Sequence, residues 1–199
     1  MMPLPANLKM LEADSLSLGF TMASNTLTGS LLRSLVASKP AGRFLELGTG
    51  TGFAKVWMLD GMDDASQLMS VENDIRAGHV AKKHLAYDPR LRLELTDGLT
   101  LLQELQGQHF DLIFADTWPG KLERPDFALN LLAQGGFYVI DDMNNRLKDK
   151  LDPVAGIPND VLQRVPKQLR DLETMLYTRA DLHCTTLDIS TGIMICTKI

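Results

Sequence analysis

The chain has 199 residues, of which 45% are hydrophobic and 23% charged, a globular composition that argues against disorder or a coiled coil. Its 20 basic and 25 acidic side chains give a net charge of −5, which disfavours broad binding to a nucleic-acid backbone. Neither a signal peptide nor a long apolar span is visible, so we expect a cytoplasmic protein that binds neither membranes nor nucleic acid. The two cysteines, Cys184 and Cys196, are too few for a disulfide framework and are expected to be buried thiols.

Leucines at helical spacing predict a helix over Leu27–Val36 near the start of the chain. Ser24, Asn25 or Thr26 can cap its first turn, and Pro40 follows its end. This helix is additional to the sheet described next and could roof a site there, although its leucines are expected to pack in the core.

Five short apolar runs, each followed by polar or glycine residues, predict strands in the middle of the chain. Helical patterns lie between several of them, and this alternation is typical of an α/β fold with a mostly parallel sheet. The expected strands are Arg43–Leu47, Leu68–Glu72, Leu91–Leu95, Phe110–Ala115 and Gly136–Ile140, and the expected helices include Asp74–Ala86, Gly98–Gln106 and Pro125–Ala133.

The C-terminal part departs from this alternation of strands and helices. A helix is expected over Pro166–Thr178 with the proline in its first turn, followed by strands Leu182–Ile189 and Gly192–Thr197 around a turn at Ser190-Thr191. The predicted fold is an α/β, Rossmann-like, doubly wound seven-stranded sheet, mostly parallel with a C-terminal antiparallel hairpin and helices on both faces. We expect one domain over residues 1–199, with a helical cap at 1–40 and the core at 41–199.

The most informative segment runs from Phe44 to Phe53, where an apolar strand containing Glu46 leads into three glycines at alternate positions. Gly48, Gly50 and Gly52 permit positive φ angles and let the backbone lie against a ligand. A dinucleotide fingerprint would need glycine where Phe53 stands, and the Gly-Lys-Ser/Thr of a P-loop is absent.

Acidic residues at the ends of three strands indicate which ligand this loop receives. Glu46 could accept a hydrogen bond from a cationic amino group, and Glu72 could accept both hydroxyls of a ribose. Asp97 could accept from an adenine amino group or cap the following helix. A nucleoside that carries an ammonium group, as S-adenosylmethionine does, matches these features.

The motifs resemble those of the class I S-adenosylmethionine-dependent methyltransferases over nearly the whole chain. The segments that carry the resemblance are Leu45–Gly52, Ser70–Asp74, Thr96–Gly98 and Asp111–Asp116, together with the terminal hairpin. Within that class the chain is most similar to the small O-methyltransferases of the catechol and caffeoyl-CoA type, on the residues Phe110–Lys121, Gly135–Asp142 and Met22–Leu32.

The resemblance implies which residues contact the cofactor and which bind a metal. The expected cofactor contacts are Ala23, Glu46, Gly48, Thr49, Gly50, Gly52, Glu72, Asn73, Asp97, Gly98 and Asp116. Asp116, Asp141 and Asp142 correspond to the family's ligands for Mg²⁺ or another divalent cation, with an acid where the family has asparagine. The alternative is that these acids cap helices or accept hydrogen bonds from loop amides.

Asp116, Trp118 and Lys121 are the expected catalytic residues. Trp118 could wall the pocket, and Lys121 could deprotonate an acceptor hydroxyl. In the family the lysine follows the tryptophan directly, whereas Pro119 and Gly120 intervene here, so a solvated loop lysine is the alternative.

The sequence therefore favours in-line methylation of an oxygen on a small hydroxylated acceptor. A non-catalytic sensor or scaffold that binds S-adenosylmethionine, and an N-methyltransferase, are the alternatives. Association into a homodimer is left open.

Overall fold

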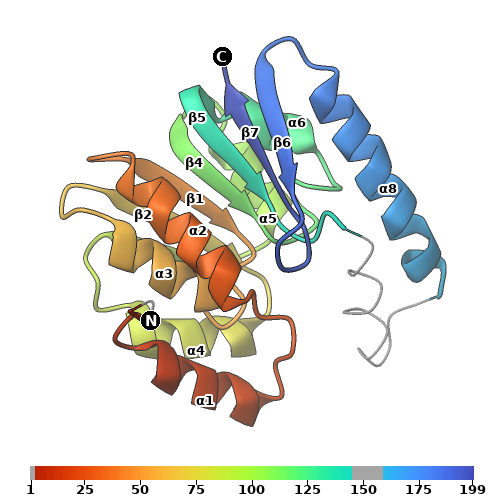
Figure 1. The fold of residues 1–199 in the computed structure, drawn as a ribbon. Helices are drawn as coiled ribbons and strands as arrows, with labels where there is room; N and C mark the ends of the chain where they lie inside the picture. The colour runs from red at the N-terminus through yellow and green to blue at the C-terminus, as the bar shows by residue number, and fades with distance from the viewer. Residues whose placement is uncertain (1–2, 145–158) are drawn as a thin grey trace.

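The computed structural model describes residues 3–144 and 159–199, which form a seven-stranded sheet with helices on both faces (Figure 1). The strands are β1 (Arg43–Leu47), β2 (Gln67–Glu72), β3 (Leu91–Leu95), β4 (Phe110–Ala115), β5 (Leu132–Ile140), β6 (Leu182–Leu187) and β7 (Ile193–Lys198). Their order is β3-β2-β1-β4-β5-β7-β6, with β1 to β5 parallel and β7 antiparallel to both neighbours. The predicted fold class is confirmed.

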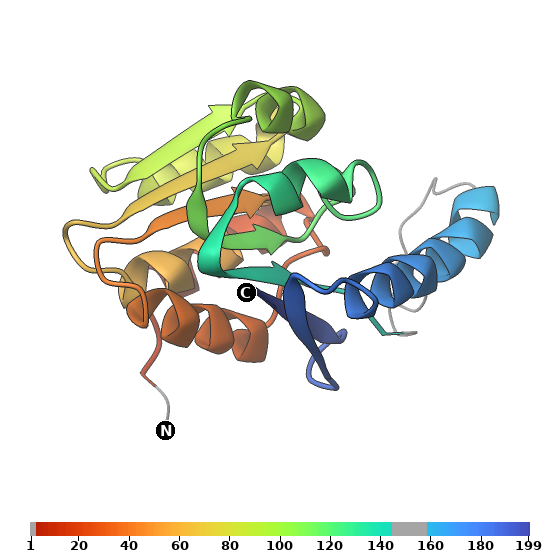
Figure 2. The same cartoon turned by 90° about the horizontal axis from the view of Figure 1, so that it is seen from above.

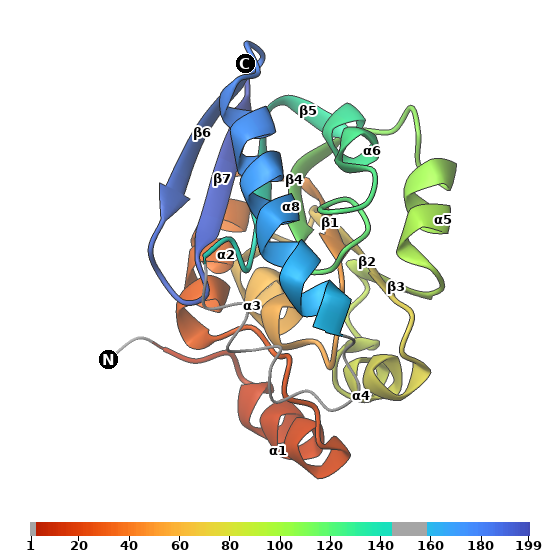
Figure 3. The same ribbon diagram turned by 90° about the vertical axis from the view of Figure 1, so that its right-hand side faces the viewer.

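Two groups of helices cover the two faces of the sheet (Figures 2 and 3). The first comprises α1 (Leu8–Leu18), α2 (Thr26–Ala37), α3 (Phe53–Gly61) and α4 (Ile75–Leu85), and the second α5 (Gly98–Glu104), α6 (Pro125–Asn130) and α8 (Asn159–Tyr177). None of the helices in the described part of the chain is both long enough and apolar enough to cross a bilayer.

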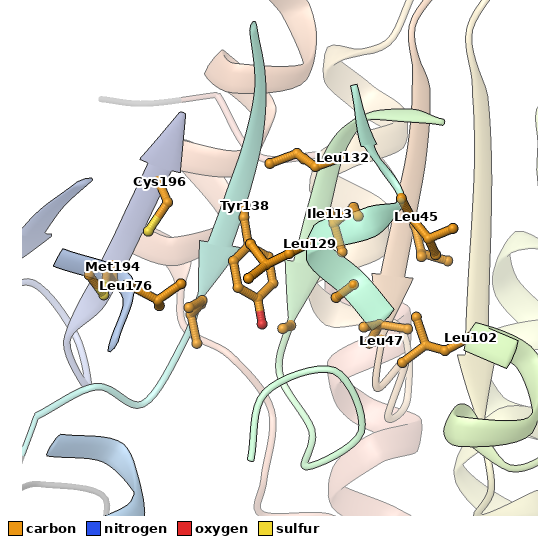
Figure 4. Close-up of a cluster of buried hydrophobic side chains, with 14 of the residues drawn as sticks. Leu45, Leu47, Leu102, Ile113, Leu129, Leu132, Tyr138, Leu176, Met194 and Cys196 are labelled. Carbon is orange, nitrogen blue, oxygen red and sulfur yellow. The ribbon is translucent and has the colours of Figure 1, made fainter. Parts of the chain in front are cut away.

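The core forms two layers because successive strand residues point to opposite faces. In β1, Leu45 and Leu47 pack with α5 and α6, whereas Phe44 packs with the helices of the first group. Figure 4 shows the first of these layers, in which Tyr138 lies among leucines and Ile113. The central strands are thus buried on both sides, as parallel strands covered by helices are.

Helix α2 begins where its cap predicts. The Asn25 side chain accepts hydrogen bonds from the backbone N–H groups of Leu27 and Thr28, and Leu32 is fully buried. The expectation that the leucines all pack in the core is wrong for Leu27, which is 57% exposed because it lies on the outer side of the first turn. The helix packs along α3, with Gly29 against Trp57.

Two predicted boundaries in the second half of the chain are wrong. Helix α6 ends at Asn130 and β5 begins at Leu132, because the buried leucines here belong to the start of the strand and not to the end of the helix. Helix α8 begins at Asn159, so Pro166 lies inside it. A proline there removes one backbone hydrogen bond, and the burial of Val165 and Leu169 beside it holds the helix in place.

The hairpin turn is longer than the expected two residues. Strand β6 ends at Leu187 and β7 begins at Ile193, with Ser190 and Gly192 in the left-handed region. Across the hairpin Cys184 pairs with Cys196, of which Cys196 is buried, as expected, and Cys184 only partly so.

The contact between α2 and α3 gives a test of this packing. A Cβ atom on Gly29 would lie 2.4 Å from Cδ1 of Trp57, so Gly29→Leu must push the helices apart. We expect a loss of about 1–3 kcal/mol in the free energy of unfolding, despite the better helix propensity of leucine. Urea denaturation measures it, with Ser34→Leu on the exposed side of α2 as the matched control. Equal stability of the two variants would contradict the packing.

Candidate active site

The reversal of strand order between β1 and β4 creates a crevice at the carboxyl ends of the parallel strands, the place where open α/β sheets bind ligands. A cavity lies there, lined by residues from five separate segments. They are Phe20, Met22, Ala23 and Ser24 ahead of α2, Gly48, Thr49, Gly50, Thr51, Phe53 and Ala54 after β1, Glu72 after β2, Asp116, Thr117, Trp118, Lys121 and Leu122 after β4, and Asp142 after β5.

The glycine loop after β1 forms one wall of the cavity. Gly48 has φ +94° and a Cβ there would lie 2.9 Å from Cβ of Thr117, so only glycine allows the loop to approach β4 this closely. Gly50 is covered by the ring of Phe20, and its N–H donates to a carboxylate oxygen of Glu72 at 2.6 Å. The loop is thereby fixed between two strands and the segment that precedes α2.

Glu46 lies beneath this loop and not in the cavity. Its side chain is fully buried, accepts a hydrogen bond from Ser70, and lies 3.6 Å from Nζ of the equally buried Lys55. Nζ of Lys55 also donates to the hydroxyl of Thr49 at 3.2 Å. The predicted contact between Glu46 and a ligand's amino group is therefore corrected: even-numbered residues of β1 face α3, which supplies the partner from within the protein.

Burial sets the titration of this pair. Loss of water disfavours both charged forms, so it raises the pKa of the Glu46 carboxyl and lowers the pKa of the Lys55 ammonium to about 8. The attraction between the two charges opposes both changes.

Glu72, unlike Glu46, faces the cavity. In addition to the bond from Gly50, its carboxylate accepts the N–H groups of Asn73 and Asp74 at 3.0 and 2.8 Å. Asn73 and Gly98 line a small depression beside the main cavity. Asp97 caps α5 by accepting from the N–H of Thr100, which is one of its two predicted roles.

The end of β4 contributes the predicted catalytic residues. Asp116 accepts a hydrogen bond from the hydroxyl of Ser24 at 2.9 Å, which ties the segment before α2 to the sheet. The segment before α2, including Ala23, therefore covers the cavity. Helix α2 itself, which was expected to do so, packs on α3. Trp118 is half-buried against the core and forms another part of the wall.

Lys121 is held inside the cavity by a tight turn. The N–H of Lys121 donates to the carbonyl of Trp118 at 3.0 Å, and Gly120 adopts φ +76° against Leu47. The buried hydroxyl of Tyr138, whose pKa burial raises well above its usual range, donates to the carbonyl of Gly120. Only 3% of Lys121 is exposed, so the alternative of a solvated loop lysine is wrong.

The two acids after β5 point in different directions. Oδ1 of Asp141 accepts the N–H of Asp142 at 2.7 Å and the hydroxyl of Thr191 at 2.8 Å, so Asp141 fastens the strand end to the hairpin turn. Asp142 has a left-handed backbone (φ +59°), lines the cavity, and has Oδ2 4.0 Å from Nζ of Lys121.

These contacts do not fit the divalent cation that the resemblance implies. Asp141 does not line the cavity, and an ammonium group stands beside Asp142. Within residues 3–144 and 159–199, no cluster of three or more His, Cys, Asp or Glu side chains is arranged to hold a metal. The predicted ligand set of Asp116, Asp141 and Asp142 is therefore not brought together around one point.

The cavity thus brings together most of the residues expected from the sequence. Ala23, Gly48, Thr49, Gly50, Glu72, Asp116, Trp118, Lys121 and Asp142 line it, Asn73 and Gly98 lie beside it, and Glu46, Gly52, Asp97 and Asp141 do not line it. Lys55 and Tyr138 were missed. A single charge within the apolar run Phe53–Leu59 could have drawn attention to Lys55, whereas no signal in the sequence indicates Tyr138.

Solved structures share this fold over the whole chain. The crystal structure of the O-methyltransferase TomG from Streptomyces achromogenes in complex with SAM superposes with a TM-score of 0.81 at 21% identity, covering 100% of this chain and 92% of that one. The O-methyltransferase from Bacillus cereus in complex with SAH gives a TM-score of 0.82 at 17% identity, with 100% and 93% covered. The fold is that of these methyltransferases.

The sequence profile of the O-methyltransferase family matches residues 7–199, and the chain belongs to that family. Curated relatives include a "Putative O-methyltransferase" of Mycolicibacterium paratuberculosis, 29% identical over 119 residues, and one of Mycolicibacterium smegmatis, 30% identical over 137 residues. The matches cover 56% and 65% of this chain and 53% and 62% of those relatives, so the chain spans a little over half their length. The resemblance seen in the motifs is confirmed.

The buried pair beneath the loop gives a second test. Lys55→Met leaves the Glu46 carboxylate buried without its cation, and we expect it to cost about 3–5 kcal/mol of stability. The double variant Glu46→Gln/Lys55→Met should recover much of that loss, because no buried charge remains. Lys83→Met, which breaks the exposed ion pair with Asp14, is the control and should cost no more than about 1 kcal/mol. Urea unfolding that gives equal losses for Lys55→Met and Lys83→Met would contradict the assignment.

Proposed function

We propose that the protein is an S-adenosylmethionine-dependent O-methyltransferase that acts on a small hydroxylated acceptor. One observation carries the proposal: the glycine loop, the Glu72 carboxylate and the buried Lys121 line the same cavity. Family membership supports it, and so do the SAM and SAH bound to the two structural relatives.

We assign the cofactor to the half of the cavity between β1 and β2. Glu72 would accept the ribose hydroxyls, and the backbone of Gly48–Gly50, with Ala23 opposite, would enclose the amino-acid end. Asn73 and Gly98 would border the adenine, with Asp97 in reach from the cap of α5. Thr49 and Gly52 would act through the shape of the loop, since the Thr49 hydroxyl is bonded beneath it.

The acceptor would lie in the other half, between Trp118 and Lys121. The bound cofactor supplies a methyl group on a positively charged sulfur. The protein's task is to hold the acceptor oxygen in line with that methyl group, and Trp118 and Met22 would confine it. Asp116, fixed by Ser24, would border both halves. Because attack by an oxyanion on the sulfonium cancels two charges, a dry wall such as the Trp118 ring favours the reaction.

Turnover distinguishes this proposal from a non-catalytic binder. We would incubate the protein with S-adenosylmethionine carrying a labelled methyl group and a panel of phenols, catechols and carboxylic acids. The proposal expects labelled ether or ester together with S-adenosylhomocysteine, whereas a sensor leaves the cofactor intact. Transfer only to amines would favour an N-methyltransferase. The cytoplasmic location and the homodimer remain predictions from the sequence.

Glu72 gives the sharpest test of the cofactor assignment. Glu72→Ala removes the carboxylate that would accept the ribose hydroxyls, so the dissociation constant for S-adenosylhomocysteine should rise about 10- to 100-fold. Glu72→Gln keeps one acceptor oxygen and should lose less. Isothermal calorimetry measures both dissociation constants. Glu104→Ala, at an exposed residue of α5, is the matched control.

Unchanged affinity in Glu72→Ala, or preference of the native protein for NAD, would contradict the assignment. Circular dichroism and urea unfolding of each variant separate lost contacts from a disturbed loop, since Glu72 also accepts the N–H of Gly50.

A further inference from the structure

The acceptor half of the cavity contains a cation that belongs to the protein. Nζ of Lys121 lies 4.0 Å from Oδ2 of Asp142, and the two side chains are only 4% and 7% exposed. Asp116 lines the same cavity. Two carboxylates and one ammonium group therefore share a region from which most water is excluded.

The backbone turn that carries this ammonium is fixed by several hydrogen bonds. The turn that carries Lys121 is closed by three N–H groups, those of Lys121, Leu122 and Glu123, which all donate to the carbonyl of Trp118. The Tyr138 hydroxyl holds the preceding carbonyl of Gly120. A lysine held in this way loses less conformational freedom on meeting a ligand than a lysine on an open loop does.

We propose that Lys121 takes the place of the divalent cation in this chain, so that methyl transfer here proceeds without a metal. The inference rests on the proposed function and concerns the same cavity. A metal bound at Asp142 would have to displace the ammonium or bring a second positive charge against it, and the repulsion between like charges at such distances opposes this.

The replacement also narrows the acceptor class. A metal can chelate two adjacent oxygens, whereas an ammonium is a point charge with N–H donors that needs no chelating pair of oxygens. The acceptor is accordingly a molecule with one ionised oxygen, a phenolate or a carboxylate, whose proton leaves to water before binding. The oxygen's electron pair forms the new bond to the methyl carbon, and the carbon–sulfur pair stays on sulfur. The anionic acceptor and the sulfonium cation thus become a neutral methylated oxygen and a neutral thioether.

Manganese binding tests the replacement without any knowledge of the acceptor. We would titrate Mn²⁺ into the protein loaded with S-adenosylhomocysteine and follow free Mn²⁺ by electron paramagnetic resonance. Lys121→Met removes the ammonium and leaves the carboxylates of Asp142 and Asp116 as oxygen ligands, so Mn²⁺ affinity should rise at least about tenfold. The double variant Lys121→Met/Asp142→Asn should lose that gain. Lys39→Met, at a lysine that binds the carbonyl of Gly135, is the matched control and should not change affinity.

The native protein and Asp142→Asn keep the test decisive if Lys121→Met does not fold. Mn²⁺ binding by the native protein that Asp142→Asn abolishes would overturn the proposal, as would equal affinity in the native protein and Lys121→Met. Absence of such binding in the native protein supports it. Methyl transfer to any acceptor found should persist in EDTA, and restoration by Mg²⁺ after loss in EDTA would overturn it. Failure to bind S-adenosylhomocysteine would instead contradict the proposed function.

Discussion

The buried ion pair of Glu46 and Lys55 fixes the glycine loop on which the cavity depends. Removing each charge from water costs several kcal/mol, while attraction between charges about 4 Å apart is worth about 4 kcal/mol at an effective dielectric constant of 20. The attraction therefore offsets only part of the desolvation cost, and among the described residues Oε1 of Glu46 has no hydrogen-bond partner. Its main effect is geometric: through Thr49 and Ser70 it joins the loop, β2 and α3 into one network.

Two lysines in the described part of the chain, Lys55 and Lys121, are buried in different surroundings. Lys55 lies beneath the loop, and its charge is directed toward Glu46 and away from any ligand. Lys121 lines the cavity, with Asp142 as its neighbour at a longer distance. Because Lys121 lines the cavity, its ammonium can meet an added anion, whereas the ammonium of Lys55 is enclosed beneath the loop.

The sequence predicts the sheet well because each central strand is a short apolar run buried on both faces, and three helix starts because Asn25, Asp74 and Asp97 accept N–H groups within one turn. The prediction fails where the direction of a side chain determines which residues it contacts. Glu46 lies just ahead of the loop in the sequence, yet alternation along β1 turns its side chain toward Lys55 on α3. Pro119 and Gly120 separate Lys121 from Trp118 in the sequence, and the turn they form places Lys121 in the cavity.

The placement of Lys121 in the cavity depends on β5 as much as on the turn. Tyr138 and Asp142 belong to the same stretch of chain, so the residue that holds the carbonyl of Gly120 and the residue that faces Lys121 move together. Because β5 lies beside β4 in parallel register, a shift of one strand against the other would displace the hydroxyl from Gly120 and the carboxylate from Lys121 at once. Thr191 adds a third constraint by binding Asp141 from the hairpin turn. The ammonium and the carboxylate both lie on loops, and hydrogen bonds from Tyr138 and Thr191 fasten these loops to the sheet and the hairpin.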